Sequence, residues 1–206
     1  MRGVLNRELH RIFTEFSDVI KEEGISQIVG AGPSALPFSR ALARAYRRRY
    51  GQKLVLVNLG EVGETIARTE LKDGPVRVRK LLLDRRPKFD LESKALLLDD
   101  VVLRGASLRS LSSALSQAGL DHKSACIVDY HSTSTLPDYV GLSYNSNSRL
   151  ANDLFSLAYS KRGNSVAFAQ RLVAKGKRPE FILMQNATFR ARLMKIADSV
   201  EPARIR

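Results

Sequence analysis

The sequence of 206 residues predicts an α/β fold, a parallel twisted sheet flanked by helices. Short apolar runs of strand length alternate along the chain with segments whose apolar residues recur every three or four positions. This alternation is typical of parallel strands joined by crossover helices. Small-residue loops follow two of the apolar runs, at residues 30–35 and 105–107, where a parallel sheet presents its carboxyl edge.

The N-terminal part predicts an amphipathic helix followed by one βαβ unit. The helix ends near Gly24, and a short strand at residues 25–29 runs into the first small-residue loop. A helix over residues 37–50 follows, with Gly51 as its stop, and a strand at residues 53–59 completes the unit.

The remaining chain continues the pattern after a charged insertion. Residues 60–93 are dense in charge with a turn at residues 73–75, and we interpret them as a mobile loop over a binding site. Further strands are predicted at residues 95–98, 125–130 and 139–144. Helices are predicted after Gly105 and, in the C-terminal segment, at residues 150–160, 166–174 and 188–197.

The most informative stretch surrounds two adjacent carboxylates. Asp99 and Asp100 directly follow the buried strand at residues 95–98, and Gly105 opens a helix shortly afterwards. The N–H groups and dipole of a helix start favour an anion at this edge. A dicarboxylate beside such a phosphate cradle suits a ligand with hydroxyls and a phosphate, with Mg²⁺ near. The alternative is an ordinary crossover with two solvated aspartates and a helix capped by Ser107.

Four apolar residues, an acidic pair, four residues and then Gly-x-Ser resemble the phosphoribosyl diphosphate (PRPP) signature of the type I phosphoribosyltransferases. The resemblance covers about residues 27–145. It implies that Asp99 and Asp100 bind the ribose hydroxyls and, through them, Mg²⁺. It also implies a group of residues around the 5-phosphate: Leu103, Arg104, Gly105, Ala106 and Ser107.

The resemblance further implies three parts of the chain. Residues 1–26 form an N-terminal helix, residues 27–148 a PRPP-binding core, and residues 149–206 a basic helical segment. In this family the terminal segments build a variable hood that sets substrate specificity. We also expect a homodimer.

The loop Gly-Ala-Gly-Pro-Ser-Ala at residues 30–35 admits two interpretations. It fits the dinucleotide fingerprint, but the next strand ends in Asn58 where that motif wants an acid. Pro37 also favours a helix that starts after the glycine cluster rather than within it. In type I phosphoribosyltransferases a small-residue loop here holds the diphosphate. The residues implied are Ala31, Gly32, Ser34 and Ala35.

The implied reaction is Mg²⁺-dependent transfer of ribose 5-phosphate from PRPP to a nucleobase-like acceptor, with release of diphosphate. Cations of the charged loop, with Arg68 and Lys72 as the predicted catalytic residues, would face the departing diphosphate. Leu103 replaces the carboxylate of the hypoxanthine–guanine subgroup, which argues against that subgroup. Arg104 stands where a small hydroxyl residue is more usual.

The charge of the chain leaves a second function open. The net charge is +13, and residues 149–206 hold twelve basic and four acidic side chains, a net +8. Such a field attracts polyphosphates or nucleic acid. The alternative is therefore a PRPP-sensing regulator of the same fold that binds nucleic acid through its basic surface. A dinucleotide-binding oxidoreductase is the third hypothesis.

Several classes are excluded by composition. No apolar run approaches the ~20 residues of a membrane span, and the N-terminus carries no secretory segment, so we expect a cytoplasmic protein. The single cysteine, Cys126, rules out an internal disulfide and is expected to be a buried strand thiol. The three histidines share no metal-ligand spacing.

Overall fold

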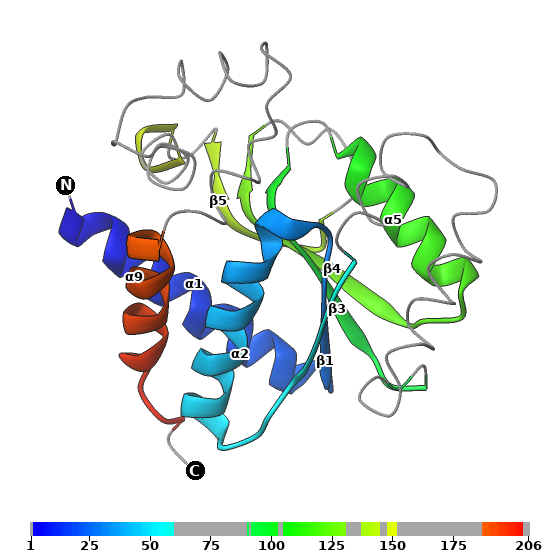
Figure 1. Ribbon diagram of the computed structural model, residues 1–206, viewed down its shortest axis with the longest axis horizontal. Coiled ribbons are helices and arrows are strands. Elements are labelled where there is room, and N and C mark those ends of the chain that lie inside the picture. Colours follow the sequence, from blue (N-terminus) through cyan, green and yellow to red (C-terminus); the bar gives the residue numbers. More distant parts are fainter. Residues whose placement is uncertain are drawn as a thin grey trace.

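Five parallel strands form one sheet in the order β2-β1-β3-β4-β5 (Figure 1). The computed structural model describes residues 2–59, 90, 92–102, 105–130, 137–144, 148–151 and 187–203. Within them the strands are β1 (Gln27–Gly30), β2 (Val55–Asn58), β3 (Ala95–Val102), β4 (His122–Asp129) and β5 (Tyr139–Ser143). The parallel sheet that the sequence predicts is thereby confirmed.

Helices cover both faces of this sheet (Figure 1). They are α1 (Arg2–Glu22), α2 (Leu36–Tyr50), α5 (Ala106–Gln117) and α9 (Ala187–Asp198), with a short 3-10 turn η1 (Pro33–Ala35). Helices α1, α2 and α9 contribute to one apolar cluster with the sheet, and α5 contributes to a second. The protein is therefore a three-layer α/β structure.

The alternation of side chains along β3 explains its continuous apolar run. Leu96 and Leu98 belong to the cluster on the side of α2, whereas Ala95 and Leu97 belong to the cluster on the side of α5. Successive side chains of a strand point to opposite faces, so a strand covered on both faces is apolar at every position.

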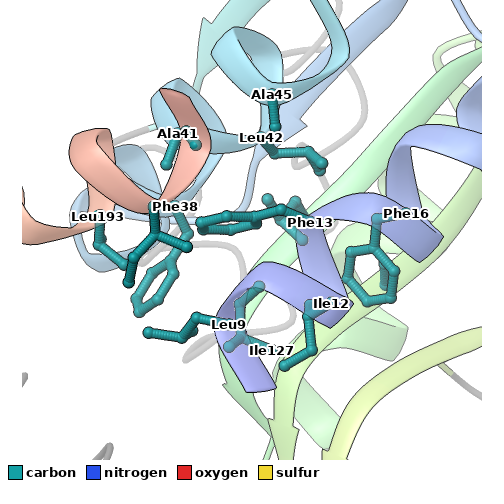
Figure 2. Packing of buried hydrophobic residues seen from close by; sticks show 14 of the residues in the cluster. Leu9, Ile12, Phe13, Phe16, Phe38, Ala41, Leu42, Ala45, Ile127 and Leu193 are labelled. Carbon is teal, nitrogen blue, oxygen red and sulfur yellow. The ribbon is translucent and has the colours of Figure 1, made fainter. Parts of the chain in front are cut away.

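Helix α1 is an integral part of the core on its side of the sheet. Its residues Leu9, Ile12 and Phe13 are fully buried, and α1 packs against both α2 and α9. Figure 2 shows the side chains of the three helices converging above Ile127 of β4. The amphipathic pattern at the N-terminus correctly predicts this helix. The division into hood and core remains a prediction.

The boundaries of two strands differ from those expected. Strand β3 does not end before the acidic pair but continues through it to Val102, because pairing with β4 persists at Asp99 and Val101. Strand β4 begins at His122, three residues before its predicted start. Gly51 stops α2 as predicted, in a left-handed conformation with its N–H bonded to the carbonyl of Arg47.

Several predictions lie outside the described residues. These are residues 60–89 of the charged loop, with the turn at residues 73–75, and the helix at residues 166–174. Most of the helix at residues 150–160 lies outside as well, whereas the final predicted helix is confirmed as α9. No helix in the described part of the chain has the length and apolar character needed to cross a membrane.

Gly141 permits α1 to approach the backbone of β5. A Cβ at position 141 would lie 2.8 Å from the carbonyl oxygen of Ile127 and 3.0 Å from a methyl carbon of Ile12. We expect Gly141→Ala to lower the free energy of unfolding by about 1–3 kcal/mol, because backbone cannot yield cheaply to an added methyl group. Urea unfolding tests this, with Gly3→Ala as the control, since a Cβ at position 3 meets open space. Equal stability of the two variants would contradict the packing described.

A polar network ties α1 to the sheet at its amino edge. Lys94 and the hydroxyl of Tyr139 donate to the carboxylate of Glu23 at 2.5 and 2.8 Å. The hydrogen bond from Lys94, and then that from Tyr139, lowers the pKa of Glu23. Burial and then the Glu23 carboxylate raise the pKa of Tyr139 to about 12.

The lowered pKa of Glu23 predicts a pH-dependent stability. The network stabilises the fold above the unfolded-state pKa of a glutamate, about 4.3, and the stabilisation is lost as the pH falls through the lower folded-state pKa. We expect wild-type protein to lose more stability than Glu23→Gln between about pH 6 and pH 3. Urea unfolding at both pH values measures the difference, with Glu22→Gln as the neighbouring control. Parallel losses in wild type and Glu23→Gln would refute the role of this carboxylate.

Candidate functional site

The order of the strands places a topological switch point between β1 and β3, and we call the region at the carboxyl ends of these two strands the crevice. The chain leaves β1 through α2 and reaches β2 on one side, whereas it leaves β3 through α5 and reaches β4 on the other side. These helices lie on opposite faces of the sheet (Figure 1). In open α/β sheets, ligands bind at the carboxyl ends of the strands where connections diverge in this way. The predicted acidic pair and the first small-residue loop both lie at this point.

Asp100 and Ser34 join the two sides of the crevice. The hydroxyl of Ser34 donates to Oδ1 of Asp100 at 2.8 Å, and both residues are buried, with 7% and 4% of their surfaces exposed. Ser34 belongs to the turn η1 that precedes α2, and Asp100 belongs to β3. A hydrogen bond to a buried carboxylate offsets part of the cost of removing that charge from water. The structure thus brings the loop after β1 to the acidic pair.

Asp99 has a different environment from its neighbour. Its side chain is only partly buried, and its Oδ1 accepts a hydrogen bond from the backbone N–H of Asp100 at 2.9 Å. Asp99 and Asp100 are thus neighbours on β3 that differ in exposure, one partly buried and the other buried.

The start of α5 supplies the third component of the site. Gly105 is its N-cap, with φ of +72°, and its carbonyl accepts the N–H of Arg109 at 2.9 Å. Ala106 and Ser107 are the first residues of the helix, so their N–H groups have no partner within it. The cap is Gly105 rather than Ser107, which corrects the alternative of a serine-capped crossover. Leu103 and Arg104 lie outside the described residues, as do Arg68 and Lys72.

The loop after β1 has two of its four predicted amide donors engaged within the chain. The N–H of Ala31 donates to the carbonyl of Leu98, and that of Ala35 donates to the carbonyl of Gly32. The amides of Gly32 and Ser34 remain the predicted donors to a diphosphate. Helix α2 begins only at Leu36, after the glycine cluster, which differs from the geometry of a dinucleotide fingerprint.

Asn58 contributes to the site although the sequence analysis used it only as an argument against a dinucleotide. Its side-chain nitrogen donates to the carbonyl of Gly32 at 2.6 Å from the carboxyl end of β2. Gly30 makes room for this contact, because a Cβ there would lie 2.8 Å from the same nitrogen. The signal in the sequence was that Asn58 is a polar residue at the carboxyl end of a strand next to β1.

The carboxylates of the site determine which metal ion it could hold. The described residues hold no group of three or more His, Cys, Asp or Glu side chains that could bind one. Two carboxylates, Asp99 and Asp100, nevertheless fit Mg²⁺, which is commonly held by one or two carboxylates together with substrate oxygens and water. Cys126 is buried in β4 as expected. Burial, with further effects of nearby aspartates, raises the pKa of its thiol, so the neutral thiol is favoured.

Fold and site together define an α/β protein with a parallel sheet, whose carboxyl edge carries an acidic pair beside a small-residue loop and the start of a helix. No family model matches the chain, and no match is found among curated proteins.

Solved structures do match the chain. A purine phosphoribosyltransferase from Pyrococcus horikoshii shows 16% identity and a TM-score of 0.44, over 66% of this chain and 82% of the other. A hypoxanthine phosphoribosyltransferase from Staphylococcus aureus shows 13% identity and a TM-score of 0.46, over 67% of this chain and 74% of the other. The hypoxanthine phosphoribosyltransferase of Trypanosoma cruzi shows 15% identity and a TM-score of 0.46, over 68% of this chain and 76% of the other. Similarity at this level assigns no activity, substrate or residue role to the chain.

The close approach of Asn58 to Gly30 predicts a local effect of a methyl group. We expect Gly30→Ala to lower the free energy of unfolding by about 1–3 kcal/mol, because its Cβ would meet Asn58 at 2.8 Å and Ser39 at 3.3 Å. Gly32→Ala is the matched control in the same loop, since a Cβ there meets nothing within 4 Å. Its stability should stay within about 0.5 kcal/mol of wild type in urea unfolding. A reversed order of the two variants would contradict this geometry.

Proposed function

We propose that this chain is a phosphoribosyltransferase that transfers ribose 5-phosphate from PRPP to a nitrogen of a nucleobase-like acceptor and releases diphosphate. The observation that carries the proposal is the hydrogen bond between Ser34 and Asp100. It joins a small-residue loop to an acidic pair at the point where the connections of β1 and β3 diverge. The sequence signature from residue 95 to residue 107 supplies the substrate class.

The order of groups in PRPP matches the order of groups in the crevice. PRPP carries a 5-phosphate, two ribose hydroxyls and a diphosphate. On this proposal the first turn of α5 accepts the 5-phosphate, with amides of Gly105, Ala106 and Ser107 as donors. Asp99 and Asp100 accept the ribose hydroxyls, and the loop at residues 31–35 receives the diphosphate.

The reaction replaces one bond at the anomeric carbon with another. The bond from this carbon to the diphosphate oxygen breaks, and its electron pair leaves with the diphosphate. A ring nitrogen of the acceptor forms the new bond, and the proton that it loses passes to solvent, so that the products are the nucleotide, diphosphate and one proton. Mg²⁺ held by Asp99 and Asp100 would neutralise charge on the bound polyphosphate. The amides of Gly32 and Ser34, with Arg68 and Lys72 of the charged loop, would stabilise the departing anion.

The acceptor is defined here only as a class. Leu103 lacks the carboxylate that the family resemblance associates with hypoxanthine and guanine, so we assign a nucleobase-like nitrogen acceptor without that contact. Arg104 is proposed to lie in the 5-phosphate loop. Its extra cation would favour an anionic group in or near that site.

Substitution of Asp99 tests the ribose subsite. We expect Asp99→Asn to weaken binding of PRPP with Mg²⁺ about 10-fold or more in titration calorimetry, because hydrogen bonds to a charged group contribute roughly 1.5–3 kcal/mol. Asp121→Asn is the matched control, since Asp121 is exposed just before β4 at the opposite edge of the sheet. A screen of bases for diphosphate release then identifies the acceptor. Absence of PRPP binding by wild-type protein would refute the proposal.

The same assays separate the enzyme from the regulator. A regulator would bind PRPP without releasing diphosphate from any base, and it would shift DNA or RNA in a gel with a strong dependence on salt. The net +8 of residues 149–206 is the observation that favours this second function. Diphosphate release with one base would decide in favour of the transferase.

A further inference from the structure

The carbonyl of Gly32 is the unusual group of the loop at residues 31–35. Residue 33 is proline, so the peptide unit between Gly32 and Pro33 has no N–H and presents only a carbonyl oxygen. A carbonyl oxygen directed at a diphosphate would repel it. The conformation of this one peptide unit therefore decides whether the loop attracts or repels an anion.

Two hydrogen-bond donors of the chain satisfy this carbonyl. The oxygen of Gly32 accepts a hydrogen bond from Nδ2 of Asn58 at 2.6 Å and another from the N–H of Ala35 at 3.1 Å. A carbonyl oxygen has two lone pairs, and both are used by these bonds. The amide of Asn58 reaches across from β2, and the absence of a side chain at Gly30 leaves space for it.

The opposite side of the loop is anchored on β3. The Ser34 hydroxyl donates its proton to Asp100, so it is not available as a donor to a phosphate. The loop is thus held from both strands that pair with β1: by Asn58 from β2 and by Asp100 from β3. The small residues of the loop provide its backbone, and hydrogen bonds from the neighbouring strands fix the conformation of that backbone.

We propose that Asn58 and the hydroxyl of Ser34 are positioning residues that hold the loop at residues 31–35 in the conformation that receives the diphosphate end of the substrate. This inference rests on the proposed function and assigns Asn58 a role that the sequence signature does not contain. For Asn58 it concerns the diphosphate subsite, so the ribose and 5-phosphate subsites should be insensitive to Asn58, whereas Ser34 also reaches the ribose subsite through its hydrogen bond to Asp100.

Two probes separate the subsites. Inorganic diphosphate tests the loop, and ribose 5-phosphate tests the crevice without the loop, both titrated calorimetrically in the presence of Mg²⁺. We expect Asn58→Asp to weaken diphosphate binding about 10-fold or more while ribose 5-phosphate binding changes less than about twofold. The substitution keeps the shape of the side chain, but it replaces a donor with a carboxylate that repels both the Gly32 carbonyl and the diphosphate.

Gln27→Glu is the matched control. Gln27 lies at the other end of β1, and its side-chain nitrogen likewise donates to loop carbonyls, those of Asp90 at 2.5 Å and Ser93 at 2.9 Å. The substitution Gln27→Glu therefore makes the same chemical change, an amide replaced by a carboxylate, in the same sheet but away from the crevice. We expect both probe affinities of Gln27→Glu to match those of wild type.

Hydrogen exchange in the free protein provides a readout that needs no ligand. The backbone amides of Gly32, Ser34, Ala35 and Leu36 should exchange faster in Asn58→Asp than in wild type, and Gln27→Glu should leave them unchanged. Ser34→Ala should act like Asn58→Asp on diphosphate, and Ser34→Thr, which keeps the hydroxyl, should restore binding. The two Ser34 variants still test the proposal if Asn58→Asp does not fold.

The outcomes distinguish this inference from the proposed function. Wild-type protein that binds neither probe overturns the proposed function and this inference with it. Wild-type protein that binds both probes, with unchanged affinities in Asn58→Asp and Ser34→Ala, overturns the positioning role alone. Equal weakening of both probes in Asn58→Asp also overturns it, because the effect of Asn58 would then not be confined to the loop.

Discussion

The burial of β3 on both faces is the constraint on which the rest of the molecule depends. Leu97 and Leu98 are completely excluded from solvent between two helical layers. A polar side chain within this region would lose its hydration without compensation. The first polar residues of β3 are Asp99 and Asp100, and Asp100, which is buried, requires a partner. Ser34 provides this partner, and the loop after β1 is thereby tied to β3.

This coupling gives the crevice its chemical character. Parallel pairing brings the carboxyl ends of β1 and β3 to one edge, and α2 and α5 leave that edge on opposite faces. The space between them is bordered by backbone N–H groups and by the two carboxylates of the acidic pair. On the function proposed above, an anion and a sugar would be bound there side by side. Small residues in the loop leave its backbone accessible to a phosphate oxygen.

The sequence could predict the components of the candidate site better than their connections. The acidic pair and the small-residue loop were both recognisable from composition and spacing. The bond between Ser34 and Asp100 spans 66 positions of sequence, and that between Asn58 and Gly32 spans 26. No local pattern encodes a contact over such a separation, because it depends on which strands become neighbours. The continuation of β3 through Asp99 was missed for the same reason, since pairing with β4 extends the strand.

The sequence by itself determined the layers of this protein and the ends of several of its elements. Helical and strand periodicities, the stop at Gly51 and the burial of Cys126 follow from residues close together in the chain, and such short-range patterns form wherever they occur. Only the tertiary structure decided how these elements meet. The contact of α1 with Gly141 and the hydrogen bonds that hold the loop at residues 31–35 from β2 and β3 arise when distant segments share one close-packed interior.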